Sequence, residues 1–196
     1  MKIVINLLLV GLIGVLGYLL YANIKEPIQF MKVKTERERA VVDKLMQIRQ
    51  AQDYYRSITG SFANNFDTLS YVLSTEDFMI INVMGDPDDP NFDMDQITYD
   101  TSYFPAIDSM IAMGMNLDSL RFVPFTAPGT VFEIQADTIE YQKTKVHVVE
   151  VGVIRSKFMG AYGDERFRKY DSRYKPNAFL KFGDMNTPNT AGNWER

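Results

Sequence analysis

The sequence predicts an α+β protein, in which an N-terminal transmembrane helix continues into an amphipathic helix packed on a small antiparallel β-sheet. Three observations carry this prediction. Residues 3–22 are an uncharged apolar run, apolar residues recur at helical spacing between residues 35 and 58, and residues 130–154 show the patterns of paired strands. The 196 residues suffice for one anchor and one modest domain.

The apolar run IVINLLLVGLIGVLGYLLYA has the length of a membrane-spanning helix. About 20 residues rising ~1.5 Å each match the ~30 Å hydrocarbon core of a bilayer. The run exceeds the ~7–15 apolar residues of a cleaved signal peptide, and Leu20-Tyr21-Ala22 is a poor cleavage site. We therefore expect an uncleaved, single-pass anchor over residues 1–24.

Small residues mark one side of the expected anchor. Gly11, Gly14 and Gly17 recur at three-residue spacing, which permits a second helix to approach closely, although glycine is also common in spanning helices generally. Asn6 is the one strongly polar side chain of the run, and its amide would gain a partner across a helix–helix contact. These four residues form a candidate assembly face.

A stem and amphipathic helix are expected over residues 25–60. Pro27 should kink or interrupt the helix because proline lacks the backbone donor. Thr35 and Glu38 have capping-box spacing, and Gly60 is placed to end the helix. We expect the chain's own sheet to cover an apolar stripe that includes Val41, Leu45, Ile48 and Tyr55.

A globular sheet domain is expected over residues 61–182. Its predicted elements are a helical turn over 67–73, a strand over 78–84, a short helix around 107–113, a strand stub over 122–125 and a hairpin of 130–141 with 145–154. The second hairpin strand is rich in valine and should be the more buried. The polar tail, residues 183–196, should be loosely held, with Trp194 as its docking residue.

Composition excludes several function classes. The net charge is −4 with charges dispersed along the chain, so no basic footprint for nucleic acid is present. The absence of cysteine excludes disulfides, thiolate metal sites and cysteine nucleophiles. His147 is the only histidine and no G-x-S-x-G motif occurs, so we expect His147 to be structural and the protein to be non-enzymatic.

Two charged segments are candidate binding sites. Carboxylates at alternate positions are ligands that Ca²⁺ prefers, although a solvated acidic loop without any cofactor is the simpler interpretation. The acidic segment contains Asp86, Asp88, Asp89, Asp93 and Asp95. Residues 155–176 hold seven bases and three acids interleaved with aromatic residues, and this segment is either a solvated face or a site for an acidic partner or lipid headgroups.

The order of elements resembles the type IV pilin and pseudopilin superfamily. The segment LMQIRQAQDYYRSITGSFANNFDTL (45–69) is similar to pseudopilin stems, which end in paired aromatic residues, a glycine and an aromatic loop. Residues 26–30 (EPIQF) and 192–195 (GNWE) are also similar to segments of uncharacterised membrane-anchored proteins from Bacteroidota. Pilins carry a longer basic leader and an acid inside the span, whereas here Asn6 stands roughly at that acid's place. With these two differences from pilins, the resemblance implies a pilin-like component that stays permanently anchored.

The resemblance also implies a location and partners. It places the domain in the periplasm, on a bacterial inner membrane, whereas the bases that follow the span favour the cytoplasm by the positive-inside rule. We favour the periplasm because the stem is the more specific signal. The expected function is a structural subunit that contacts membrane lipid and packs with identical or related envelope proteins, without nucleic acid. The alternative is a membrane-tethered module that captures a partner through its acidic or basic–aromatic segment.

Overall fold

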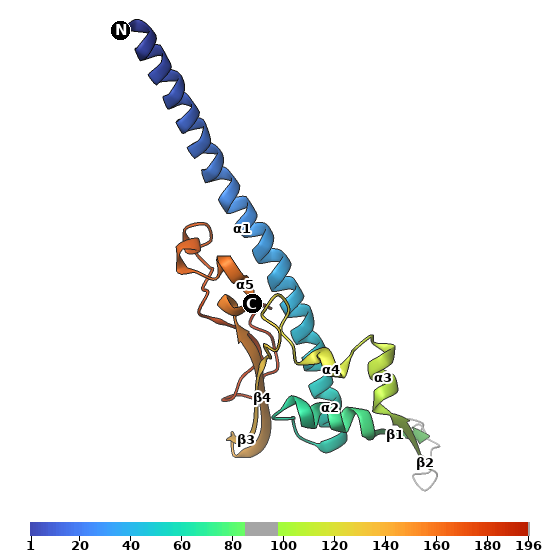
Figure 1. The fold of residues 1–196 in the computed structure, drawn as a ribbon. Coiled ribbons are helices and arrows are strands. Elements are labelled where there is room, and N and C mark those ends of the chain that lie inside the picture. Colours follow the sequence, from blue (N-terminus) through green and yellow to red (C-terminus); the bar gives the residue numbers. More distant parts are fainter. Residues whose placement is uncertain (85–97, 196) are drawn as a thin grey trace, which may run out of the picture. The chain divides into compact units, whose positions relative to one another are not determined.

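A computed structural model describes residues 1–84 and 98–195. The chain forms two compact units. Unit 1 comprises Met1–Val41, Pro124–Thr126 and Ile154–Phe179, and unit 2 comprises Val42–Val123, Ala127–Val153 and Leu180–Arg196. The fold is mixed helix and sheet, with a long N-terminal helix and two small antiparallel sheets (Figure 1).

The N-terminal helix α1 is continuous over Lys2–Thr59 and contains Pro27. The predicted interruption is therefore wrong. Proline removes one helical hydrogen bond and crowds the carbonyl four residues before it, but its fixed φ is compatible with a helix. The predicted capping box is also wrong, because Thr35 lies inside α1. Gly60 ends the helix as expected, since it has φ +82° and donates its N–H to the carbonyl of Arg56 at 2.8 Å.

The side chains of α1 are exposed near its N-terminus, and the first buried one is Phe30. The apolar side chains between Ile3 and Leu20 are half or more exposed. Phe30 is the first residue of α1 that is fully buried, residues 31–40 are exposed or half-buried, and a buried stripe at helical spacing begins at Val41. Val41, Leu45 and Ile48 are 0% exposed and Tyr55 is 8% exposed.

A helical and hairpin region follows α1 in unit 2. Helix α2 (Phe66–Thr75) begins after Asn65, whose side chain caps the Thr68 N–H. Strand β1 (Asp77–Met84) pairs antiparallel with β2 (Thr98–Pro105), and helices α3 (Ala106–Ala112) and α4 (Leu117–Leu120) come next. Strand β2 was not predicted, because TYDTSYFP alternates weakly and becomes a strand through its partner β1.

The three-stranded sheet has the order β3-β4-β5. Strands β3 (Glu133–Tyr141) and β4 (Thr144–Ile154) form the predicted hairpin, closed by Gln142 and Lys143, both with positive φ. Most of the valines of β4 are buried, whereas β3 has no buried residue, as the sequence predicts. The stub at 122–125 is reduced to a single bridge between Phe122 and Val131.

Strand β5 (Phe179–Gly183) was not predicted, and its place beside β4 depends on a glycine. A Cβ built at Gly152 would lie 2.5 Å from the Cβ of Lys181. Only glycine therefore allows the backbones of these two strands to approach this closely.

The C-terminal tail is held, contrary to expectation. The Asn193 N–H donates to the Lys181 carbonyl at 2.9 Å, and Phe182 bridges to Gly192. Arg49 of α1 donates to Glu195 at 2.7 Å. This hydrogen bond from the guanidinium also lowers the pKa of the Glu195 carboxyl.

We predict that Leu45→Ala lowers the free energy of unfolding by about 2–5 kcal/mol, because Leu45 is 0% exposed and its removal leaves a cavity. Urea unfolding of the full chain in detergent, followed by fluorescence of the single Trp194, measures this change. The control is Met46→Ala on the same turn, where Met46 is 40% exposed and the expected change is within about 0.5 kcal/mol. Equal effects of the two substitutions would contradict a buried stripe.

A second prediction concerns Gln52, the one buried polar residue of unit 2 among those described. Its side-chain amide donates to the Ala63 carbonyl and accepts the Ala63 N–H, both at 2.9 Å. Gln52→Met keeps the volume but leaves both backbone groups unpaired, at a cost of about 1–3 kcal/mol each. Hydrogen exchange at the Ala63 amide should accelerate, whereas the exposed Gln50→Met control should leave that rate unchanged.

Candidate functional site

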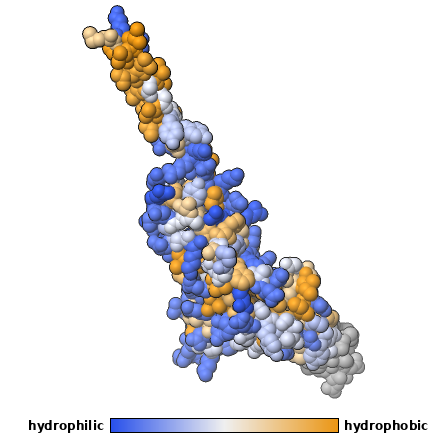
Figure 2. Space-filling view, viewed as in Figure 1, coloured by the Kyte–Doolittle hydropathy of each residue, from blue (hydrophilic) through white to orange (hydrophobic). Residues whose placement is uncertain are grey.

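The predicted assembly face lies on an exposed part of α1. Within the described residues, α1 is the single helix long and apolar enough to cross a membrane, which is compatible with a single-pass membrane protein. A Cβ placed at Gly11, Gly14 or Gly17 would have no other atom within 4 Å. Asn6 is exposed as well. Figure 2 shows this apolar part of α1 in orange, followed by hydrophilic surface.

A shallow groove on this part of α1 is lined by apolar residues and a glycine. Its volume is about 560 Å³, and Gly11 is one of its lining residues. The remaining lining residues are Val4, Leu7, Leu8, Leu12 and Val15. A hole of this kind, formed by apolar side chains around a small residue, accepts a side chain of a neighbouring helix.

The second candidate is a cluster in unit 1 that we call the aromatic clasp: Phe30, Tyr162, Phe167, Tyr170 and Tyr174. Phe30 of α1 is at its centre. The Phe167 ring stacks on Phe30 at 5.3 Å with an interplanar angle of 8°, and the Tyr174 ring meets Phe30 edge-on at 5.1 Å. Offset-stacked and edge-on pairs are the favourable geometries for aromatic rings.

The segment that supplies these rings is short and irregular. After β4 it forms α5 (Arg155–Met159), the 3-10 turn η2 (Gly160–Tyr162) and the 3-10 helix η3 (Glu165–Lys169). Asp164 caps η3 by accepting the Arg166 N–H at 2.8 Å. The Tyr174 hydroxyl donates to the Tyr162 carbonyl at 2.8 Å, which closes the segment on itself.

Polar bonds tie this segment to α1. Lys34 donates to Asp171 at 2.8 Å, and Arg155 donates to Glu38 at 3.0 Å. Arg37 donates to the Phe158 carbonyl at 2.8 Å, and the Tyr170 hydroxyl donates to Glu26. The bonds are partly buried, so they are screened less than exposed ion pairs. Residues 154–179 are thereby fixed along α1 between Glu26 and Glu38.

The electrostatics of the clasp follow from these bonds. The hydrogen bond from Lys34 lowers the pKa of the Asp171 carboxyl, and the hydrogen bond from Tyr170 lowers the pKa of Glu26. Burial raises the pKa of Tyr174 to about 12. The clasp thus favours charged carboxyls at its rim and a neutral phenol at its centre.

The basic–aromatic segment combines buried aromatic residues with exposed bases. Its aromatic residues face inward and Phe167 is 1% exposed, whereas the flanking Arg166 and Arg168 are exposed. The alternation R-F-R-K at residues 166–169 is a sequence signal that Phe167 is buried between exposed bases. No local pattern indicates that Phe167 stacks on Phe30.

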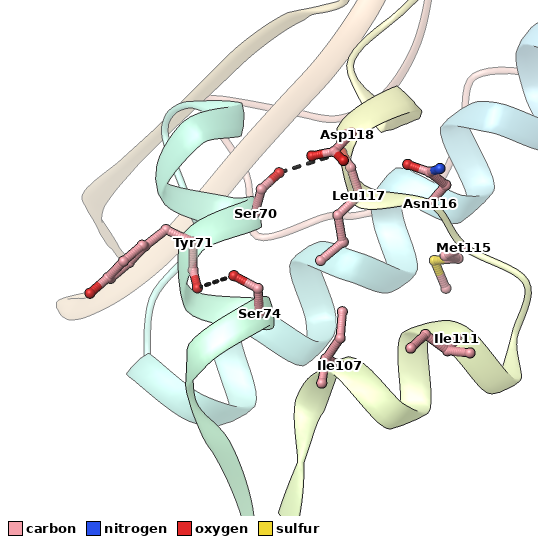
Figure 3. Close-up of a pocket in the computed structure, with 9 residues that line it drawn as sticks. All are labelled: Ser70, Tyr71, Ser74, Ile107, Ile111, Met115, Asn116, Leu117 and Asp118. Carbon is pink, nitrogen blue, oxygen red and sulfur yellow. Dashed lines mark hydrogen bonds between the residues drawn. The ribbon is translucent and has the colours of Figure 1, made fainter.

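A pocket in unit 2 was not foreseen. It has a volume of about 420 Å³ and lies where α2, α3 and the segment leading into α4 meet (Figure 3). Ile107, Ile111, Met115 and Leu117 line its apolar side. Its polar side is formed by Ser70, Tyr71, Ser74, Asn116 and Asp118.

Three of the polar residues of this pocket make local hydrogen bonds. The Ser70 hydroxyl donates to the Leu117 carbonyl at 3.5 Å, and the Ser74 hydroxyl donates to the Tyr71 carbonyl at 2.8 Å. Asn116 accepts the Ser119 N–H and caps α4. Ser70, Ser74 and Asn116 are thus engaged in local hydrogen bonds, and the apolar side of the pocket offers a surface for an apolar side chain.

The remaining predicted candidates lie elsewhere. The acidic residues Asp86, Asp88, Asp89, Asp93 and Asp95 fall outside the described residues. Among the residues that the structure describes, no group of three or more histidine and acidic side chains is arranged to hold a metal. His147 is half-buried on β4, with Nδ1 2.9 Å from the Thr138 hydroxyl of its cross-strand partner.

Comparison with known proteins finds no relative: no protein-family model, curated protein or solved structure matches this chain. The pilin resemblance therefore stays an expectation from residues 45–69 and the order of elements.

We predict that the stability of the aromatic clasp decreases at low pH. A carboxyl whose pKa is lowered by folding contributes stability above its unfolded pKa, and that stability is lost as the pH falls through the folded pKa. We expect hydrogen exchange of residues 160–175, corrected for intrinsic rates, to accelerate below about pH 4. In Asp171→Asn the exchange should already be faster at pH 6 and should respond less to acid. Identical profiles for wild type and Asp171→Asn would show that the Lys34–Asp171 pair does not hold the clasp.

Proposed function

We propose that this chain is a non-enzymatic, pilin-like structural subunit of a bacterial envelope assembly, anchored by residues 1–24. The observation that carries the proposal is the character of α1. One uninterrupted helix joins an exposed apolar segment to a stem that buries Phe30 and a stripe from Val41 to Tyr55. Such a helix connects a membrane-embedded surface directly to folded protein without a flexible linker.

The exposed segment has features that a lone anchor does not need. Leucine alone would give a stable spanning helix, whereas Gly11 opens a groove and Asn6 places an amide in the apolar run. In lipid, helix association depends on close packing and on hydrogen bonds between polar side chains. The groove and the amide therefore favour a packed assembly of helices, formed by identical or related subunits.

The resemblance to pilins places the folded part in the periplasm. The bases after the anchor favour the opposite orientation by the positive-inside rule. We adopt the periplasmic orientation in this proposal because the stem sequence at 45–69 is the more specific of the two signals.

A second function is favoured by the pocket between α2 and α3. A membrane-tethered module would capture an apolar side chain of a partner there, next to Tyr71 and Ile111, both 65% exposed. This function predicts a monomeric anchor and a bound partner, whereas the assembly predicts a large complex that depends on the anchor face.

We predict that Gly14→Leu releases the protein from a large complex while leaving membrane insertion intact. The added side chain blocks close approach of helices and raises the hydrophobicity of the segment. The matched control is Leu16→Phe, which enlarges a side chain about 200° around the helix from Gly14. Asn6→Leu should weaken the complex more mildly, because it removes about 1 kcal/mol of hydrogen bonding.

Blue-native electrophoresis of gently solubilised membranes measures these outcomes. If the wild type migrates as a monomer, the anchor face is not an assembly surface. The same conclusion follows if Gly14→Leu leaves the size of the complex unchanged. The tethered module would then be the better explanation.

A further inference from the structure

Charge is strongly divided between the two units, although it looks dispersed along the sequence. Unit 1 contains 13 bases and 6 acids, a net charge of +7. Unit 2 contains 8 bases and 19 acids, a net charge of −11. The net charge of −4 for the whole chain therefore hides a cationic unit that contains the anchor.

Part of this positive charge lies on η3, which is held close to the end of the anchor. Lys169 Nζ is 3.6 Å from a Glu26 carboxylate oxygen, and Tyr170 next to it donates to the same carboxylate. The Phe167 ring stacks on Phe30 at 5.3 Å. Helix η3 is thus fixed beside residues 26–30 of α1.

The rise per residue of α1 gives the distance of η3 from the hydrocarbon core of a membrane. With ~1.5 Å rise per residue, Glu26 lies about 6 Å and Phe30 about 12 Å beyond the last residue of the apolar run, Ala22. The headgroup layer on each side of a bilayer is about 5–8 Å thick. If residues 3–22 span the hydrocarbon core, η3 lies in or directly next to the headgroup layer.

The basic side chains of η3 are directed outward. Phe167 is buried, and the neighbouring Arg166, Arg168 and Lys169 are exposed. Arg166 lies over the Phe167 ring at 4.6 Å and Lys169 over the Tyr170 ring at 4.5 Å, which limits the freedom of both side chains. Lys25 of α1 is exposed at the same level.

The acids of this region are engaged within the fold. Glu26 accepts from Tyr170 and lies 3.6 Å from Lys169, Asp164 caps η3, and Glu165 is 3.5 Å from Arg168, so two of these acids pair with bases of the same surface. They reduce the local positive charge but leave the unit strongly cationic. Positive charge acts on a membrane surface within a Debye length, about 8–10 Å, and these bases lie inside that range.

We propose that Lys25, Arg166, Arg168 and Lys169, the basic collar, bind the headgroups of anionic phospholipids around the anchor. This proposal depends on the anchor of the proposed function, because η3 reaches the headgroups only if residues 3–22 span the bilayer. The aromatic clasp positions the bases, and their positive charge selects phosphatidylglycerol-like headgroups over zwitterionic ones.

Native mass spectrometry of the full chain in detergent tests this binding, with phosphatidylglycerol and phosphatidylcholine as probes. We expect the wild type to bind phosphatidylglycerol at least tenfold more tightly. The triple variant Arg166→Gln, Arg168→Gln, Lys169→Gln should lose this preference. The matched control, Arg56→Gln, Lys143→Gln, Lys145→Gln, removes three exposed bases from unit 2 and should keep it.

A conservative variant separates charge from folding. Arg166→Lys with Arg168→Lys keeps the charge and should keep the preference, because phospholipid surfaces attract both cations. Equal binding of the two lipids by the wild type, loss of preference in the control variant, or retention in the triple glutamine variant would each overturn the basic collar.

The anchor is tested separately by reconstituting the full chain into lipid nanodiscs and probing protease protection of residues 3–22. Failure to insert would overturn the anchor and with it the collar. Insertion without lipid preference would overturn the collar alone.

Discussion

The continuity of α1 across Pro27 is the constraint on which unit 1 depends. A helix that continued in a different direction after residue 27 would present another face to residues 154–179. Because α1 is uninterrupted, Glu26, Phe30, Lys34 and Glu38 follow one another at intervals of four residues on a single side. Each of these residues contacts the same returning segment.

This regular spacing explains why so irregular a segment is well held. Helices α5, η2 and η3 are too short to be stable alone. They are fixed because their aromatic rings pack against Phe30. Their polar groups bond to Glu26 on the turn before Phe30 and to Lys34 and Glu38 on the turns after it. Phe30 supplies the apolar burial, and the ion pairs of Lys34 and Glu38 set the register.

Where local pattern decides the structure, the sequence predicted it well. The stripe from Val41 to Tyr55, the cap at Gly60, helix α2 and the β3–β4 hairpin all follow from periodicity and turn chemistry within about a dozen residues. Strands β2 and β5 were missed because their partners, and not their own composition, make them strands.

The candidate sites divide in the same way. The glycines of the anchor could be identified from spacing alone, because an exposed helix face is a local property. The aromatic clasp joins Phe30 to rings at least 132 residues away, as the Phe30–Tyr162 pair shows, and no local pattern encodes that pairing. The pocket at Ser70 and Ile111 likewise needs α2 and α3 to meet.

Charge is divided unevenly between the two units of the folded chain. A uniformly acidic protein of net charge −4 would be weakly repelled by an anionic membrane. With +7 in unit 1 and −11 in unit 2, an anionic membrane would attract unit 1, which contains the apolar part of α1, and would repel unit 2. The charge of unit 1 therefore favours the lipid contacts that we propose for the basic collar, whereas the net charge of unit 2 opposes contact with an anionic surface.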